Sequence, residues 1–238
     1  MPLQTVEPQR LYRQIAEQLR LLIASGEFAV GSRLPAEREL AVQLGVSRPS
    51  VREALIALEV EGVIEVRTGS GIYVQGCAPR SATAGEIDTP DDWGPLEVMS
   101  ARMLVEAEVA ALAAAQAKPS DLRQMRTSLK RMRQQAARGE TPREGDEDFH
   151  LAIARACGNS VLLDTVQRFW QARNGSLFSR LGDYFENPQS WQAAIAEHET
   201  VLMAIETGDA RAARRAMQKH LRQAHKRYSA SWRRSPTR

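Results

Sequence analysis

Hydrophobic and polar positions follow two different patterns along this chain, and the change comes near residues 78–94. Before this segment, helical and strand patterns are mixed. Apolar residues at helical spacing predict a helix over 11–23, a second over 37–44 and a third that begins after Ser47. Over 64–74 the apolar residues alternate with a period of two around a TGSG turn, which predicts a short β-hairpin.

Every apolar pattern after residue 94 has a helical period. The segment 78–94 is rich in Pro, Gly, Ser, Thr and acidic residues without periodic apolar positions, which is typical of a linker. We therefore predict a mainly α protein: a small domain over 1–77, an all-α helical bundle over 95–232 and a basic tail over 233–238. The predicted bundle helices cover 95–117, 120–138, 143–157, 160–181, 189–207 and 209–232.

Composition narrows the class of protein only slightly. A chain of 238 residues with 43% hydrophobic residues can form two modest domains with buried cores. The formal net charge is only +3, so bulk charge does not by itself indicate a nucleic-acid partner. No apolar run is long enough to span a bilayer, no basic-then-apolar leader opens the chain, and the two cysteines show no metal-ligand spacing. We expect a cytoplasmic protein with no membrane partner.

Local placement of arginines indicates DNA binding where net charge does not. Gly45 predicts a sharp turn after the second helix, and Ser47 is a good N-cap for the third. Arg48 and Arg52 then lie four residues apart at the exposed start of that helix, where side chains can reach base edges and phosphates in a major groove. With the glycine-tipped hairpin behind it, this arrangement predicts a winged helix-turn-helix. A surface helix with solvated arginines is the alternative.

The segment GSRLPAERELAVQLGVSRPSVREALIALEVEGVIEVRTGSGIYV resembles the N-terminal domain of GntR-superfamily transcription regulators. The resemblance covers about residues 10–76 and implies double-stranded operator DNA as a partner and a homodimer as the active state. One departure is visible, because Ala36 stands where many members have a capping serine. The resemblance implies that seven residues contact DNA: Arg38, Ser47, Arg48, Ser50, Arg52, Thr68 and Gly69.

Three of the four histidines interrupt apolar stripes of the predicted bundle. His150, His198 and His220 each share a helix face with apolar neighbours. Asp146 lies one turn before His150 on the same face. Three imidazoles and a carboxylate would thus face the interior from three helices. Buried histidines need a partner, so they are satisfied either by hydrogen bonds within an ordinary core or by a metal ion. His225 lies off the stripe, and we assign it no role.

The strings PLEVMSARMLVEAEVAALAA and DEDFHLAIARACGNSVLL resemble the FCD ligand-binding domain of FadR-type regulators, over about residues 95–230. Many such domains hold a metal through one Asp and three His. The resemblance implies that Asp146, His150, His198 and His220 bind a divalent ion. Zinc is the first expectation, and this donor set also suits nickel, manganese or iron.

Arg102 and Arg173 also interrupt apolar stripes, and an inward guanidinium needs an anion. Arg102 has Glu106 at the i, i+4 spacing, which would form a structural salt bridge. Alternatively, one or both arginines bind the carboxylate of an effector, since the planar guanidinium suits bidentate binding. Both interpretations stay open at this point.

Within the family, EVRTGSGIYV, FHLAIA and FWQARNGSLF are similar to hexuronate-responsive regulators of the UxuR and ExuR type. This resemblance implies a transcription regulator, expected to be a repressor, that responds to a small carboxylate effector such as glucuronate, galacturonate or fructuronate. Two alternatives remain. A metal-dependent enzyme could act on a sugar acid, but no spare general base lies on the same helix faces. The bundle could also be a dimerisation module with core histidines.

Overall fold

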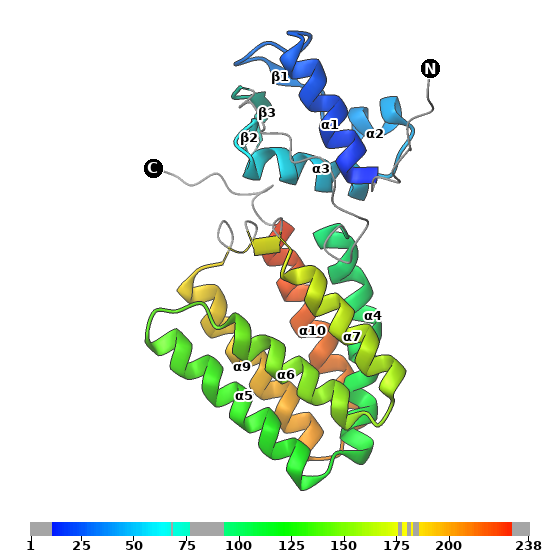
Figure 1. The fold of residues 1–238 in the computed structure, drawn as a ribbon, viewed down its shortest axis with the longest axis vertical. Coiled ribbons are helices and arrows are strands. Elements are labelled where there is room, and N and C mark those ends of the chain that lie inside the picture. The colour runs from blue at the N-terminus through cyan, green and yellow to red at the C-terminus, as the bar shows by residue number, and fades with distance from the viewer. Residues whose placement is uncertain are drawn as a thin grey trace, which may run out of the picture. The chain divides into compact units, whose positions relative to one another are not determined.

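The computed structural model describes residues 11–67, 69–76, 93–175, 178–179, 182 and 186–229. The chain divides into two compact units, with the boundary between Leu96 and Glu97. The first unit combines short helices with a small sheet, and the second is built from long helices (Figure 1). The predicted mainly α fold, with a winged helix-turn-helix followed by a helical bundle, is confirmed.

The first unit has the elements of a winged helix. Its sheet is antiparallel with strand order β1-β3-β2, and Val66 of β2 pairs with Ile72 of β3. The predicted hairpin is therefore confirmed, whereas β1 was not predicted because two residues are too few to show a period of two. The elements are α1 (Leu11–Ala24), β1 (Arg33–Leu34), α2 (Glu37–Leu44), α3 (Arg48–Val60), β2 (Ile64–Arg67) and β3 (Gly71–Val74).

The apolar stripes of α1 and α3 form the core of this unit. Ile15 and Leu19 of α1 are buried, as are Val51, Leu55 and Leu58 of α3. Burying these branched side chains offsets much of the entropy lost in ordering so small a unit. Because α3 is anchored along its inner face, the outer face of its first turns is held in a fixed position.

The turn between α2 and α3 has the predicted chemistry. Gly45 adopts the left-handed conformation at φ 67°, and the Val46 N–H donates to Ala41 O at 3.1 Å, which closes α2 in a Schellman-type cap. Ser47 then caps α3, since its hydroxyl accepts from the Ser50 N–H at 3.4 Å. The sequence thus places the start of α3 directly after a tight turn.

The N-terminus of α2 lacks a side-chain cap, as predicted from Ala36 in place of the capping serine that many members have. Ala36 has the extended backbone of an N-cap residue, and the Glu39 carboxylate accepts from the Ala36 N–H at 2.9 Å, a contact that involves no Ala36 side-chain atom. We expect Ala36→Ser to raise the free energy of unfolding of this unit by about 1 kcal/mol, because the hydroxyl would satisfy one more helix N–H.

Urea denaturation followed by circular dichroism measures this change. Ala29→Ser is the control, because Ala29 is exposed in a loop where no helix begins, so its stability should change by less than about 0.5 kcal/mol. An equal gain in both variants, or no gain at Ala36, would contradict the capping argument.

The second unit is a bundle in which α5 packs against α6 and α9, and α6 packs against α7. One predicted boundary is wrong. The helix predicted over 160–181 ends at Arg173, because Asn174 and Gly175, both poor helix formers, follow directly. The helices are α4 (Pro95–Gln116), α5 (Pro119–Ala137), α6 (Arg143–Ala156), α7 (Ser160–Arg173), α9 (Pro188–Glu206) and α10 (Ala210–Ser229).

Within the part of the chain that the structure describes, no helix combines the length and the apolar character that crossing a bilayer requires. The predicted DNA contact Thr68 and the predicted tail over 233–238 lie outside the described residues.

Candidate functional site

The first candidate surface lies at the start of α3. Ser47, Arg48, Ser50 and Arg52 occupy its cap and first turns, and the Arg48 side chain is 61% exposed. Ser47 and Ser50 also contact each other, with their hydroxyl oxygens 2.9 Å apart, so both hydroxyls take part in contacts at the start of the helix. The structure therefore brings four of the predicted DNA contacts together on one helix end.

Two further predicted contacts lie on neighbouring elements. Arg38 is exposed on α2, and Gly69 is exposed in the turn between β2 and β3 with a φ of 74°. That positive φ is accessible to glycine at little cost, and it keeps the turn narrow. These positions are consistent with a recognition helix flanked by a wing, and the contacts themselves stay a prediction.

A carboxylate that the sequence analysis did not single out lies against the two arginines. Glu37, the first residue of α2, accepts hydrogen bonds from Arg48 Nε at 2.9 Å and from Arg52 Nε at 2.8 Å and Nη2 at 3.1 Å. The Glu37 side chain is only 10% exposed. These pairs span 11 and 15 residues of sequence, so no helical spacing could have revealed them.

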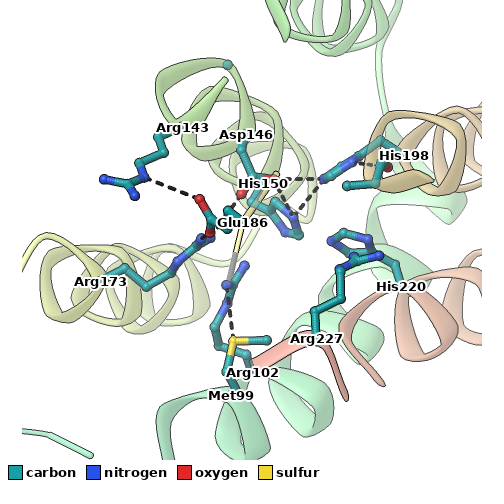
Figure 2. A network of polar contacts seen from close by, with 12 residues as sticks. Met99, Arg102, Arg143, Asp146, His150, Arg173, Glu186, His198, His220 and Arg227 are labelled. Carbon is teal, nitrogen blue, oxygen red and sulfur yellow. Dashed lines mark hydrogen bonds and ion pairs between the residues drawn. The ribbon is translucent and has the colours of Figure 1, made fainter. Parts of the chain in front are cut away.

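The second candidate site lies inside the bundle, where three helices bring one carboxylate and three imidazoles together. Asp146 and His150 come from α6, His198 from α9 and His220 from α10, and all four are buried. One potential ligand atom from each residue lies within 4.8 Å of the others (Figure 2). The predicted convergence of these four side chains is confirmed.

The Nδ1 atom of each imidazole is already bound to a protein acceptor. His150 Nδ1 donates to Glu106 Oε2 at 2.5 Å, His198 Nδ1 to the Ala194 carbonyl at 2.6 Å, and His220 Nδ1 to Glu197 Oε2 at 2.8 Å. A neutral imidazole that donates from Nδ1 has a lone pair on Nε2. Metal-binding histidines typically have such a second partner, which fixes the tautomer and the ring orientation.

The contacts among the ligand atoms fit a cation better than an ordinary core. His150 Nε2 lies 3.2 Å from His198 Nε2, which in turn lies 2.9 Å from Asp146 Oδ1. If His198 gives its only proton to the Ala194 carbonyl, both contacts join lone pairs, and the buried Oδ1 lacks a donor. Such a convergence of acceptors is costly without a positive charge between them, and a divalent ion would remove the cost.

The protonation states favoured by the surroundings suit metal binding. Burial raises the pKa of the Asp146 carboxyl, but a proton on His198 Nε2, whose place a divalent ion would take, and the charge of Arg173 outweigh burial and hold that pKa well below its usual range. Burial lowers the pKa of His150 and, together with the neighbouring imidazoles, lowers that of His220 much further. The site thus favours an ionised carboxylate and neutral imidazoles at His150 and His220, the forms that bind metals.

Arg102 forms the salt bridge considered for it from the sequence and also lines a cavity, while its binding of an effector stays a prediction. It is 1% exposed and donates from Nε to Glu106 at 2.5 Å, so the i, i+4 salt bridge exists. Its Nη1 contacts the sulfur of Met99 at 3.7 Å, a weak acceptor, and the residue also lines a cavity beside the histidines (Figure 2). Glu106 therefore joins Arg102 to His150.

Arg173 lines the same cavity. Its Nη1 donates to Asp146 Oδ2 at 2.9 Å, and the guanidinium lies 4.5 Å from the ring centre of Trp170. The Arg102 guanidinium is also 4.5 Å from a Trp170 ring centre. Trp170 could not be recognised from the sequence, because an aromatic residue in an apolar stripe indicates nothing beyond core packing.

A cavity of about 40 Å³ lies beside the cluster and is partly open to solvent. Arg227 and Glu186 border it and are the more exposed of its charged residues, at 24% and 13% of the side chain. Its polar lining comprises Arg102, Asp146, Arg173, Glu186, Ser190, His220 and Arg227. A small anionic molecule that entered this cavity would meet arginine side chains beside the cluster.

Two family descriptions match this chain. The model of the family "Bacterial regulatory proteins, gntR family" matches residues 11–74, and the model of the "FCD domain" matches residues 97–223. These ranges include the first candidate surface and the second candidate site, respectively.

Similar proteins span most of the chain. A "Uxu operon regulator" of Haemophilus influenzae is 37% identical over 213 residues, which cover 89% of this chain and 79% of that protein. An "Exu regulon transcriptional regulator" of Escherichia coli is 37% identical over 226 residues, covering 92% and 84%. Among solved structures, E. coli McbR/YncC has a TM-score of 0.50 at 22% identity over 90% of this chain and 95% of that one, which supports the fold alone.

Proposed function

Because the chain belongs to the gntR family of bacterial regulatory proteins and carries an FCD domain, we propose that it is a repressor whose affinity for operator DNA is set by a small carboxylate bound at a metal site. The observation that carries the proposal is the buried cluster of four ligands with its three imidazoles held through Nδ1. Asp146, His150, His198 and His220 would hold a divalent ion. The ion would supply a strong local attraction for an anion.

The charge balance around the cluster favours an anionic effector. Among the charged side chains around the cluster that are no more than 11% exposed, Arg102 and Arg173 balance Glu106 and Asp146, so a divalent ion would leave two positive charges in a buried place. Uncompensated charge in a low-dielectric interior is costly, so an incoming carboxylate would stabilise the loaded site.

We propose a hexuronate or a related sugar acid as the effector. Two relatives at 37% identity carry names that refer to the Uxu operon and the Exu regulon, which supports this class. A sugar acid offers a carboxylate for the ion and hydroxyls for the polar lining at Ser190 and Glu186. Arg102 and Arg173 would bind its anionic or polar edge.

On the DNA side, we propose that the start of α3 reads base edges while Arg38 and Gly69 approach the backbone and the neighbouring groove. We also propose a homodimer, because a two-fold symmetric protein matches two half-sites of a pseudo-palindromic operator. The exposed Arg48 on α3 and the fold of the first unit support the DNA contact, and the homodimer rests on the family resemblance.

The cavity offers little to the enzyme alternative. Its two lining carboxylates, Asp146 and Glu186, already pair with arginines, so among the described residues lining it none is a carboxylate free to act as a general base. A cavity that can bind an anion but has no free general base suits an effector-binding site better than a catalytic site.

A thermal-shift screen of glucuronate, galacturonate and fructuronate tests the effector proposal. We expect at least one sugar acid to raise the melting temperature of the metal-loaded protein, because a ligand that binds only the folded state stabilises it. Arg102→Ala or Arg173→Ala should weaken that shift, whereas Arg126→Ala, which removes an exposed arginine from α5, should not. Equal shifts in all variants would place the effector elsewhere.

A further inference from the structure

The carboxylate of Glu37 lies between the two arginines on which the proposed DNA contact depends. Three hydrogen bonds join it to Arg48 and Arg52, at 2.8 to 3.1 Å. It contacts both arginines through Nε. Among the described residues, Glu37 contacts Arg48 through Nε alone, and the Arg48 side chain is 61% exposed. One acid on α2 therefore sets the direction of two side chains on α3.

The burial of Glu37 is unfavourable for a carboxylate unless its contacts compensate for the lost hydration. The Glu37 side chain is 10% exposed, and removing a carboxylate from water costs free energy that its contacts must offset. Two guanidinium groups and the N-terminus of α2, where Glu37 is the first residue, supply that compensation. An acid directly beneath a DNA-binding surface also repels phosphates, so it weakens non-specific binding. One arginine bonded to Glu37 would be enough to link α2 to α3, so a purely structural role does not explain the contact with the second arginine.

We propose that Glu37 is a positioning residue for sequence specificity. It holds the Arg48 and Arg52 guanidinium groups in fixed directions before DNA arrives, so less side-chain entropy is lost on binding, and the arginines present one geometry rather than many. Its negative charge lowers affinity for DNA in general. Both effects increase the ratio of specific to non-specific binding. This inference rests on the proposed role of Arg48 and Arg52 as base-reading residues.

If Glu37 positions the arginines, Glu37→Gln should change the affinity for non-specific DNA and the preference for a specific site in opposite directions. Affinity for non-specific DNA should rise, because a negative charge is removed beside the phosphates. The preference for a specific site should fall by about fivefold or more, because bidentate arginine–guanine contacts that supply discrimination lose their alignment. A merely structural role, by contrast, would lower binding to both kinds of DNA together with stability.

The experiment uses the full-length protein and the tightest duplex that the wild type selects from a randomised pool. Fluorescence anisotropy at several salt concentrations gives affinities for that duplex, for versions with single G·C pairs replaced, and for a scrambled duplex. Glu27→Gln is the matched control, since Glu27 is exposed in a loop of the same unit and its replacement changes the net charge equally. The control should keep the wild-type preference.

Epistasis with the arginines separates this inference from the proposed function. In a background with Arg48→Ala and Arg52→Ala, Glu37→Gln should have no further effect on preference, because it acts through those side chains. If the two arginine substitutions leave binding unchanged, the proposed DNA contact itself is wrong. If they weaken binding but Glu37→Gln keeps the full preference, only the positioning role is overturned. Should Glu37→Gln fail to fold, Glu37→Asp, which withdraws the carboxylate by one methylene, must lower the preference instead.

Discussion

His198→Ala and His220→Ala are each expected to abolish stoichiometric metal binding, whereas His225→Ala is expected to keep it. The wild type should carry about one divalent ion per chain. Each of the first two substitutions removes one of four converging ligands, and the loss should exceed about 100-fold in affinity, because removing a mere second-sphere partner already costs 10- to 100-fold. His225 lies on the same helix, α10, but outside the cluster.

Elemental analysis after dialysis, together with melting curves with and without a chelator, measures this effect. In the wild type the chelator should lower the melting temperature, because loss of a ligand bound only to the folded state removes its stabilisation. In His198→Ala the chelator should change nothing. If the wild type never retains metal, or if all three variants retain it equally, the histidines are core residues satisfied by ordinary hydrogen bonds.

Arg48→Ala and Arg52→Ala are each expected to cost about 1 to 3 kcal/mol of specific DNA binding, which is roughly a 5- to 150-fold loss of affinity. Both side chains project from the first turns of α3, which the buried Val51 and Leu55 anchor from beneath. The loss should be largest on the specific duplex and smaller on scrambled DNA, because base contacts carry discrimination and phosphate contacts do not.

Anisotropy titrations with the selected duplex measure these losses. Arg211→Ala is the charge-matched control, since Arg211 is exposed on α10 in the other unit. Wild-type affinity in both α3 variants would refute the assigned recognition surface. A loss of equal size in the control would show that only net charge matters.

Much of the fold could be predicted because it depends on local rules. Period and turn chemistry located the helices of the first unit and its hairpin, and the pair Gly45 and Ser47 marked the tight turn before α3. Strand β1 escaped prediction because two residues show no period. The end of α7 was misplaced because apolar spacing continued past Asn174 and Gly175, whose poor helix propensity outweighed it.

Some residues of the candidate site could likewise be predicted from the sequence, and others could not. Asp146 and the three histidines could be found because a polar residue in an apolar stripe is visible in sequence. The residues that orient them could not, since Glu106 contacts His150 across 44 positions and no periodicity links the two. Glu37 was missed for the same reason. Contacts between elements require the packing of the helices, which the sequence pattern alone does not specify.

The central proposal for this protein is that a sugar acid controls DNA binding through the metal site. The most direct test is an anisotropy titration of hexuronates into the complex of the protein with its selected duplex, carried out with metal-loaded and with metal-stripped protein of equal helicity. The account predicts release of DNA from the loaded protein, little or no release from the stripped protein, and recovery of the response when the metal is restored. Equal release with and without metal, or no release by any hexuronate, would contradict it.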